Sequence, residues 1–476
     1  MSKLKEIRDS VLRQIRPIPS EVEKGFRIFN HIKQSIQEVA EKKEVELAFI
    51  NLEGSSGRKQ TQLRNHRELD IFIGISPDIL SSLIKTKQPK KPFLRKFFKK
   101  LVIDIGLDGA NQAGCHTSSI AYAEHPYVTV SFDDYKADIV FCFDLTPEFL
   151  STHGPITAVD RTPHHTRFVD QHLTERQRDD VRLLKAFLLS TFVYGDASPV
   201  GRSGFTGFST EMIIYHHADI EGALKFLAQP QPEPLDIHNR SVSVLRKRFA
   251  RELLIITDPT DSNRNIAASI SERAYRFSQH KAASLLQNPT ESYFAMQPIP
   301  ILSIDELHLL GPNYFVIEFR DDTGWHYTKT RDKLYRYFVK LQKFLNREPT
   351  GEPRFGSTIF EEIFQEPYFA IALHVNRLDI GKSYKRVGPS PQFVEGTEEF
   401  LKKHPDAFLK DGRYQAEITR IFTNAEQAIH HFLTTNPLSK KLTLMNISNH
   451  GSTTLGKQAL WILSNAILPY ITPKNS

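Results

Sequence analysis

Cysteine is almost absent from this chain of 476 residues, which contains only Cys115 and Cys142. Two cysteines so far apart exclude a disulfide framework and a four-cysteine zinc site, and we expect both to be buried thiols. No apolar run reaches the length of about 18 residues that a bilayer span requires. The charged, amphipathic start at residues 1–15 also lacks the apolar centre of a signal peptide. These absences favour a cytoplasmic protein.

Two common catalytic motifs are missing as well. The chain contains no G-x-x-x-x-G-K-[ST] segment, which excludes a P-loop. Its nineteen histidines include no H-E-x-x-H motif and have no cysteine partners, so a zinc site is not expected. Any phosphate or metal chemistry must therefore rest on other residues.

The composition is that of a globular protein with a basic excess: 40% of residues are apolar, 25% are charged and the net charge is +7. At about 150 residues per domain, the length predicts roughly three domains. The charge favours an anionic partner without identifying it. Eight of the sixteen residues at 85–100 are Lys or Arg, with Phe93, Phe97 and Phe98 interleaved. This segment is either a solvated amphipathic helix, from about residue 93, with its Phe side chains in the core, or a direct phosphate contact.

Hydrophobic periodicity divides the chain into an α/β first third, a helical middle and a mixed last third. We expect strands at 45–52, 68–75, 127–132, 137–145, 314–319 and 368–375. We expect helices at 4–15, 20–42, 178–195, 332–346 and 424–434. The proline-rich segment 228–240 is expected to be a linker or a surface loop.

Two acidic residues stand one residue apart at the start of the expected strand 68–75. Side chains alternate along a strand, so Glu68 and Asp70 share one face while Leu69 and Ile71 point into a core. Asp138 occupies a similar place at the start of the apolar run 137–145. If the two strands are neighbours, three carboxylates converge, and a pair of Mg²⁺ ions is the usual way to neutralise such a cluster in phosphoryl transfer.

A short Gly/Ser loop, GSSGR at residues 54–58, precedes these carboxylates. Its backbone N–H groups can cradle a triphosphate, with Arg58 or Lys59 supplying positive charge. Either motif alone is also compatible with an ordinary strand edge. The order strand, Gly-Ser loop, acid-x-acid and third acid on a later strand is more specific.

At this point the chain resembles the polymerase beta nucleotidyltransferase superfamily, and within it the archaeal-type (class I) CCA-adding enzymes. The resemblance covers about residues 10 to 435. The segments that carry it, in family order, are AEHPYV (123–128), TAVDRTPHH (157–165), DVRLLK (180–185), VYG (193–195), SGFTGFSTEMII (203–214), DPTDSNRN (258–265), YKRVGPSPQF (384–393) and DGRYQAEITRIFTNAEQAI (411–429).

The resemblance implies an enzyme that adds CCA, or part of it, to the 3′ end of tRNA from CTP and ATP without a template. Glu68, Asp70 and Asp138 would be the catalytic residues and would hold two Mg²⁺ ions. The nucleotide-binding residues that it implies are Gly54, Ser55, Arg58, Thr162, His165, Lys185, Tyr194 and Arg264.

The residues alone leave some of these roles open. Lys185 and Tyr194 are nine residues apart, so on one straight helix they would point in opposite directions. Both can face a nucleotide only if the helix bends or ends before Tyr194. Otherwise Tyr194 is a core aromatic residue and Lys185 lies at a solvated helix edge. Arg264 fits a phosphate or base contact and a plain surface role equally well.

The family's architecture implies an α+β multidomain fold in four parts. These are a nucleotidyltransferase head at 1–150, a mostly helical neck at 151–270, an α/β body at 271–385 and 426–476, and a small tail at 386–425. The tail would hold the acceptor stem and T-arm of tRNA, with Lys402, Lys403 and Lys410 near its phosphates. A homodimer is left open, and no membrane partner is expected.

The sequence departs from the family pattern in one short stretch. Glu68 stands where the family has Asp, and the segment from Gly54 to Glu68 is one residue longer than the family spacing. The extra residue could let the longer Glu68 side chain retreat to the same point. Two alternatives therefore stay open: a paralogue that extends another RNA or a free nucleotide, or a tRNA-binding relative with weakened catalysis.

Overall fold

The computed structural model of the chain describes residues 3–83, 91–122 and 126–471. The chain forms two compact units. The first comprises Met1–Ser198 and Ser203–Gln297, and the second comprises Pro199–Arg202 and Pro298–Ser476. The α+β class expected from the sequence is confirmed, because both units combine helices with sheets.

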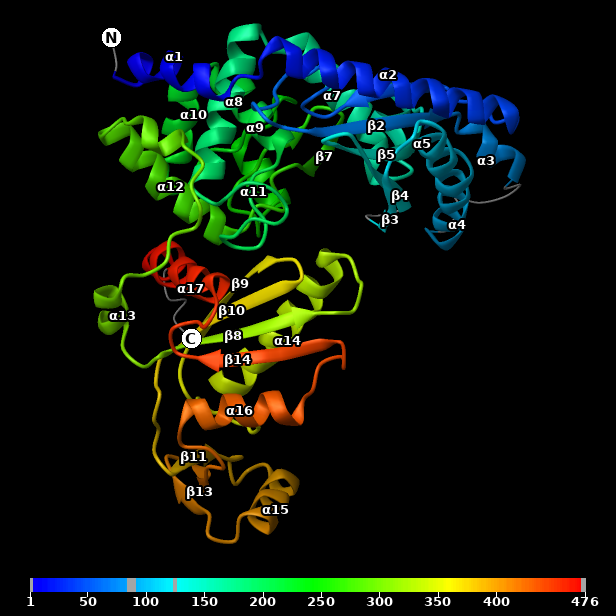
Figure 1. Cartoon of the computed structure of the whole chain (residues 1–476). Coiled ribbons are helices and arrows are strands. Elements are labelled where there is room, and N and C mark those ends of the chain that lie inside the picture. The colour runs from blue at the N-terminus through cyan, green and yellow to red at the C-terminus, as the bar shows by residue number, and fades with distance from the viewer. Residues whose placement is uncertain (1–2, 84–90, 123–125, 472–476) are drawn as a thin grey trace. The chain divides into compact units, whose positions relative to one another are not determined.

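The first unit contains a five-stranded sheet and a helical region that follows it along the chain (Figure 1). Its strands are β1 (Phe49–Glu53), β2 (Glu68–Ile75), β3 (Thr117–Tyr122), β4 (Pro126–Phe132), β5 (Tyr135–Phe143), β6 (Thr257–Asp258) and β7 (Asp261–Asn265). Its α-helices are α1 (Lys3–Ile15), α2 (Pro19–Lys42), α3 (Asp78–Leu83), α4 (Lys91–Leu101), α5 (Asp108–Gln112), α6 (Pro147–His153), α7 (Thr162–His172), α8 (Glu175–Ser190), α9 (Gly207–His217), α10 (Ile220–Leu227), α11 (Val242–Arg248) and α12 (Glu272–Gln287).

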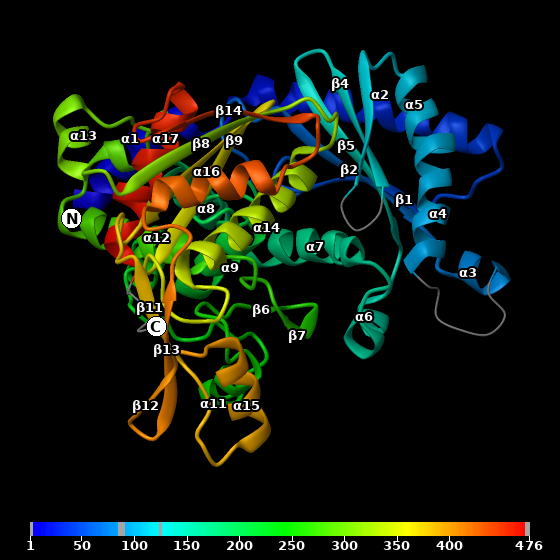
Figure 2. The same cartoon turned by 90° about the horizontal axis from the view of Figure 1, so that it is seen from below.

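One face of the five-stranded sheet is buried and the other carries the acidic residues. The strand order is β1-β2-β5-β4-β3, with β2 and β5 parallel and the other pairs antiparallel. Leu69, Ile71 and Ile73 of β2 pack into a core with apolar residues of α2 and α4. Figures 1 and 2 show α2 running along the sheet. The alternation predicted for residues 68–75 is thereby confirmed, and Asp70 is left on the opposite face.

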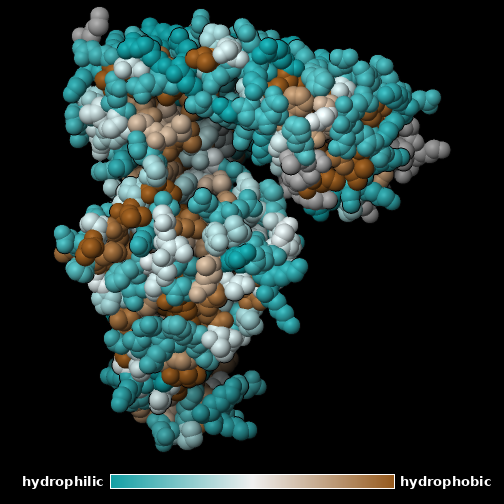
Figure 3. Space-filling view, in the orientation of Figure 1, coloured by the Kyte–Doolittle hydropathy of each residue, from teal (hydrophilic) through white to brown (hydrophobic). Residues whose placement is uncertain are grey.

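The second unit is built on a four-stranded antiparallel sheet in the order β14-β8-β10-β9. It also contains a three-stranded sheet in the order β11-β13-β12, whose strands lie between β10 and β14 in the sequence. Its strands are β8 (Tyr314–Asp321), β9 (Thr358–Gln365), β10 (Tyr368–Val375), β11 (Ser383–Val387), β12 (Phe408–Lys410), β13 (Arg413–Thr419) and β14 (Leu442–Ser448). Its α-helices are α13 (Ile304–Leu310), α14 (Tyr327–Asn346), α15 (Val394–Lys403), α16 (Ala425–Thr435) and α17 (Thr454–Trp461). Figure 3 shows apolar residues gathered over α13, where Ile304 and Leu309 are exposed.

Several expected elements differ from the structure in their bounds: the helix expected at 332–346 is α14, Tyr327–Asn346, and the strand expected at 137–145 is β5, Tyr135–Phe143. The strand expected at 45–52 is β1, Phe49–Glu53, because the backbone N–H of Val45 instead caps α2 by bonding to the carbonyl of Ala40. The helix expected at 178–195 is α8, which starts at Glu175 after a capping box at Thr174 and ends at Ser190. Phe192 then adopts a positive φ of 60° that a helix cannot continue.

Some smaller expectations also need correction. Cys142 is buried as expected, but Cys115 is only partly buried. On α4 the side chains of Leu94 and Phe98 face the core, whereas Phe93 is 37% exposed. Residues 85–90 of the basic segment lie outside the described residues. Of the two alternatives for residues 228–240, the structure agrees with the loop: they lie within the first unit, and the unit boundary falls later, after Gln297.

Among the helices that the structure describes, none is both long and apolar enough to cross a bilayer.

Candidate active site

Asp70 and Asp138 lie side by side on the open face of the five-stranded sheet. The parallel pairing of β2 with β5 places Asp70 directly opposite Asp138, so both side chains project from the same face. Thr129 of β4 lies opposite Asp138 on its other side, and its hydroxyl donates to Asp138 Oδ1 at 2.6 Å. The structure therefore brings together the two aspartates that the sequence placed on separate strands.

Glu68 is the exposed first residue of β2, on the same face as Asp70. Burial raises the pKa of Asp70 to about 6, and the charges of Asp138 and Glu68 add to this rise against the opposing effect of Lys59 and Lys136. The three carboxylates thus repel one another. A cation beside them would relieve this repulsion.

The carboxylates fit a divalent ion by chemistry and by position. Oxygen ligands from aspartate and glutamate suit Mg²⁺ and similar hard cations. Within the described residues, however, no three His, Cys, Asp or Glu side chains already form a complete ligand cluster. Asp70 and Asp138 are thus the fixed part of the candidate metal site, and Glu68 lies at its solvent edge.

The loop between β1 and β2 begins against Asp70. Gly54 has a φ of 65°, and a Cβ atom there would lie 1.9 Å from Asp70 Oδ2, so only glycine fits. Two hydrogen bonds fold the loop back on itself: the N–H of Thr61 donates to the carbonyl of Ser55 at 3.0 Å, and the hydroxyl of Ser56 donates to the carbonyl of Glu68 at 2.9 Å. The turn therefore lies directly beside the carboxylates.

A buried ionic cluster of Lys59, Thr61, Lys185 and Glu211 joins this loop to α8 and α9. Lys59 Nζ lies 2.8 Å from Glu211 Oε2, and the hydroxyl of Thr61 donates to Glu211 Oε1 at 2.7 Å. Lys185 donates to the carbonyl of Thr61 at 3.0 Å and lies 3.9 Å from Glu211. Two ammonium groups share one carboxylate, so the cluster carries a net positive charge suited to an anion.

Tyr194 and Lys185 converge although they are nine residues apart. Because α8 ends at Ser190, Tyr194 lies on the following segment, where it forms a bridge with Phe205. A Cβ atom on Gly207 would lie 3.3 Å from Tyr194 Oη and 3.8 Å from Lys185 Nζ. Burial raises the pKa of Tyr194, as do Glu211 and Asp70. Its hydroxyl therefore stays protonated and can donate.

His165 and Arg264 meet at a residue that the sequence reading missed, Asp258. His165 Nε2 lies 2.9 Å from Asp258 Oδ2, and Arg264 donates to the same oxygen at 2.7 Å. Burial opposes ionisation of Asp258, but its hydrogen bonds from His165 and Thr260 lower its pKa overall. The imidazole stacks on Phe208, with ring centroids 3.9 Å apart. Asp258 is the first residue of the DPTDSNRN segment, whose resemblance to the family was the sequence signal that could have identified it.

This second group is linked to the first through Phe208. Lys59 Nζ lies 5.1 Å from the centre of the Phe208 ring, on which His165 stacks. Thr162, the half-buried first residue of α7, lies one helical turn before His165. The exposed Arg58 lines a cavity whose described lining includes none of Asp70, Lys185 or Tyr194.

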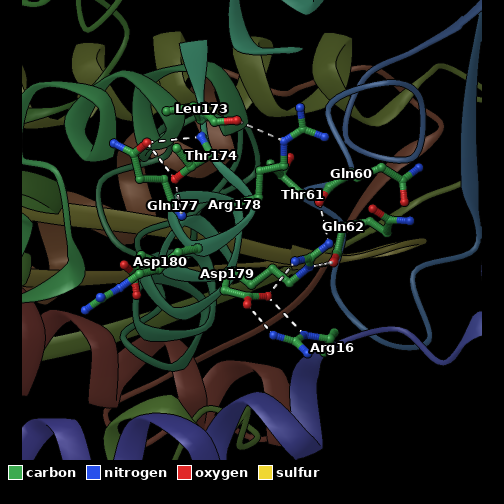
Figure 4. A network of polar contacts seen from close by, with 12 residues as sticks. Arg16, Gln60, Thr61, Gln62, Leu173, Thr174, Gln177, Arg178, Asp179 and Asp180 are labelled. Atoms are coloured by element: carbon green, nitrogen blue, oxygen red, sulfur yellow. Dashed lines mark hydrogen bonds and ion pairs between the residues drawn. The ribbon is translucent and has the colours of Figure 1, made fainter. Parts of the chain in front are cut away.

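Arginines at the start of α8 fasten the loop to the helical region (Figure 4). Arg182 donates to the backbone carbonyls of Gln60 and Gln62, and Arg178 donates to the carbonyl of Arg58 at 3.3 Å. Asp179 receives bonds from Arg182 and from Arg16, the residue that follows α1. Arginines of α8 therefore hold three backbone carbonyls of the loop, those of Arg58, Gln60 and Gln62.

Glu211 was the other functional candidate that sequence reasoning missed. It stands within the apolar run of SGFTGFSTEMII and is only 1% exposed. An acidic residue on the buried part of a helix usually has a charged partner, which is the signal that could have found it. Its partners, Lys59 and Lys185, lie far away in the sequence.

Comparison with known proteins shows what this chain is similar to. The family model for the second domain of tRNA nucleotidyltransferases matches residues 179–295. The CCA-adding enzyme of Pyrobaculum neutrophilum is 29% identical over 414 residues, which cover 85% of this chain and 91% of that protein. The CCA-adding enzyme of Methanocaldococcus jannaschii is 27% identical over 455 residues, which cover 94% of this chain and 92% of that protein.

Solved structures give a weaker likeness. A structure of Cid1, described as having RNA terminal uridylyl transferase activity, is 13% identical with a TM-score of 0.46 and covers 63% of this chain and 99% of that chain. The sequence relatives, by contrast, match along most of their length and of this chain. Together with the domain match, they show that this chain is similar to CCA-adding enzymes of archaea along most of its length.

Proposed function

We propose that this chain adds CCA, or part of it, to the 3′ end of tRNA, using CTP and ATP and releasing pyrophosphate. The observation that carries the proposal is the pairing of Asp70 with Asp138 beside the turn at Gly54 and the cationic cluster of Lys59 and Lys185. Acidic and cationic groups placed side by side match the needs of a metal-bound triphosphate.

Each group has a distinct role in this proposal. Asp70, Asp138 and Glu68 hold two Mg²⁺ ions, which supply charge neutralisation and activation of the attacking hydroxyl when bound. The backbone at Gly54 and Ser55 contacts the triphosphate, and Lys59 and Lys185 neutralise its charge. Tyr194 donates a hydrogen bond to the same ligand.

His165 and Arg264 line the far end of the nucleotide site in this proposal. Arg264 is 40% exposed even while it is paired with Asp258, so its guanidinium group can contact a ligand. His165 is fixed by Asp258 and Phe208. Thr162 and Arg58 remain predicted nucleotide contacts that no described hydrogen bond supports.

The four-part architecture also belongs to the proposal. The head, neck and body would have the bounds predicted from the sequence, and the tail at 386–425 would contact the acceptor stem and T-arm. Lys402 and Lys410 are exposed, which supports phosphate contact, whereas Lys403 is paired with Glu399 at 2.5 Å. Shape and backbone contacts of this kind are typical of duplex RNA recognition.

The direct test incubates the protein with tRNA that lacks its terminal CCA, with labelled CTP or ATP and Mg²⁺, and then sequences the 3′ ends. Addition of C, C and A in order supports the proposal. Products made from nucleotides without tRNA would instead identify a paralogue with another acceptor. Retention of tRNA without any metal-dependent incorporation would identify a relative with weakened catalysis.

Substitution of Glu68 tests how the longer side chain is accommodated. Ser56 of the extended loop contacts the backbone of Glu68, which supports a coupled change of loop length and side-chain length. We expect Glu68→Asp to lower the rate of incorporation by about tenfold to a hundredfold, because its carboxylate falls short by about 1 Å. Single-turnover incorporation measures the effect. A faster Glu68→Asp variant would show that glutamate handicaps the site.

Lys185 predicts a pH dependence of nucleotide binding. Burial lowers the pKa of Lys185 to about 8, with Glu211 opposing and Lys59 adding to this shift. The side chain is charged below about pH 8 and becomes neutral above it. We expect the affinity for CTP to fall by about tenfold as the pH rises through 8, because a charge-assisted contact to phosphate is lost.

The matched control for this prediction is Lys185→Arg. Arginine stays protonated throughout the pH range of the measurement described next. Its CTP affinity, measured by equilibrium binding between pH 6.5 and 9.5, should therefore not show the fall near pH 8. An equal fall in both proteins would assign the titration to another group.

A further inference from the structure

A cavity of about 250 Å³ opens at the free edge of β1, between α2 and the start of α7. β1 is the terminal strand of its sheet, so no strand of the described residues pairs with this edge. The lining contains none of Asp70, Asp138, Lys185, Tyr194 or His165. The cavity is therefore a separate feature from the proposed catalytic site, with Arg58 the one predicted nucleotide contact in its lining.

Three cations line the cavity from three different elements: Lys33 from α2, Arg58 from the loop after β1, and Arg167 from α7. Within the parts of the chain that the structure describes, none of them is paired with a carboxylate. Three cations that converge from separate elements attract an anion, and they outnumber the two carboxylates of the lining, Glu53 and Asp144. Arg58 and Arg167 can each bind phosphate oxygens through two parallel N–H groups.

The inner part of the cavity combines aromatic rings with buried polar groups. Phe26, Phe29 and Phe49 line it, and such rings stack on flat ligands. Glu53 and Thr166 also line it and are 3% and 2% exposed. Among the described atoms, Glu53 Oε2 and the Thr166 hydroxyl have no hydrogen-bond partner. Buried polar atoms of this kind are rarely left unpaired, so they indicate a ligand with complementary polar groups.

We propose that the cavity bounded by Lys33, Glu53, Arg58, Thr166 and Arg167 binds a nucleoside phosphate, separately from the nucleotide that reacts. The phosphate lies against the three cations, the base packs on the phenyl rings, and Glu53 and Thr166 bind its polar edge. At about 250 Å³ the cavity lies just below the usual range for small-ligand pockets, which favours a small molecule over an RNA strand.

Glu53 and Thr166 present side-chain oxygens to the inner part of the cavity. Carboxylate and hydroxyl oxygens can accept hydrogen bonds from the N–H groups of a base edge. Phosphate at the rim and a base against Glu53 therefore satisfy both parts of the cavity with one molecule.

The test uses 8-azido-ADP in the presence of EDTA, without tRNA, followed by photolabelling and peptide mapping. We expect labelled peptides from residues 26–33, 49–53 or 163–167. The double variant Lys33→Gln, Arg167→Gln should reduce this label at least about tenfold, because two charge-assisted contacts are lost. The matched control is Arg27→Gln, which removes an exposed cation from the same helix outside the cavity.

Competition separates the possible ligands. AMP and ADP should displace the label at lower concentration than inorganic phosphate, because only they fill the aromatic part. Equal displacement by inorganic phosphate would overturn the assignment to a nucleoside. Labelling that is confined to peptides around Gly54, Lys185 and Tyr194, or that survives in the double variant, would overturn the site itself. CCA addition can fail or succeed independently of each of these results.

Discussion

Asp70→Asn is expected to reduce nucleotide incorporation by at least about a thousandfold while leaving the fold intact. Asparagine keeps the shape of the side chain but removes the charge between Asp138 and Glu68. A divalent ion bound there would lose a ligand charge, and metal ions in such sites contribute several kcal/mol to transition-state stabilisation. Incorporation under single-turnover conditions with saturating tRNA measures the effect. Affinity for tRNA should be unchanged, because phosphate contacts do not involve this residue.

The same variant should be at least as stable as the unsubstituted protein when a chelator removes all metal. Burial and the neighbouring carboxylates raise the pKa of Asp70 to about 6. A carboxyl with a raised folded-state pKa stabilises the fold at low pH and loses that contribution as the pH rises from about 4 to 6. The free energy of unfolding in chelator should fall over this interval in the unsubstituted protein and less in Asp70→Asn, with a difference of roughly 1–3 kcal/mol at pH 7.

The control for both effects is Asp133→Asn. Asp133 lies in the turn between β4 and β5, is 57% exposed and has a φ of 50°, which asparagine tolerates well. This variant should retain incorporation and show no altered pH dependence. If Asp70→Asn retains more than a tenth of the incorporation rate, Asp70 does not hold a catalytic ion.

The carboxylate pair was predictable from the sequence because strand alternation and parallel pairing are local rules. The apolar alternation at 68–75 predicted which side chains point to the core. The similar pattern at the start of 137–145 predicted that Asp138 lies level with Asp70 on a neighbouring strand. That Lys185 and Tyr194 lie close together could be predicted only on the condition that the helix ends between them. Thr191 and the positive φ of Phe192 meet that condition.

The remaining parts of the site depend on contacts between distant segments, which no periodicity reveals. Lys59 and Glu211 are 152 residues apart, and His165 and Asp258 are 93 apart. The sequence offered Arg58 and Lys59 as equal choices, and only the fold shows that Lys59 turns inward while Arg58 faces another cavity. A single sequence therefore does not show which residues pair with its buried charged groups.

Glu211→Ala is expected to have the largest effect on stability of any substitution in the site. The carboxylate is 1% exposed and is the charge partner of Lys59, with Lys185 close by. Its removal leaves two buried ammonium groups without compensation, and breaking a buried ion pair in this way costs about 3–5 kcal/mol. For a protein with units of 150–250 residues or more, each kcal/mol lowers Tm by roughly 2–4 °C. Thermal unfolding should therefore shift by roughly 10 °C at pH 7.

The deficit of the Glu211→Ala variant should narrow as the pH rises from 7 to 9. Without the carboxylate the pKa of Lys185 falls further below 8, so the folded variant releases a proton that the unfolded chain still binds up to its ordinary pKa near 10.4. Stability rises with pH wherever the unfolded state binds more protons. Glu221→Ala is the matched control, since Glu221 pairs with Lys225 on an exposed helix face and such pairs contribute about 0.3–0.5 kcal/mol. A Tm loss in Glu211→Ala no larger than in this control, or one that grows with pH, would contradict a buried lysine cluster held by one carboxylate.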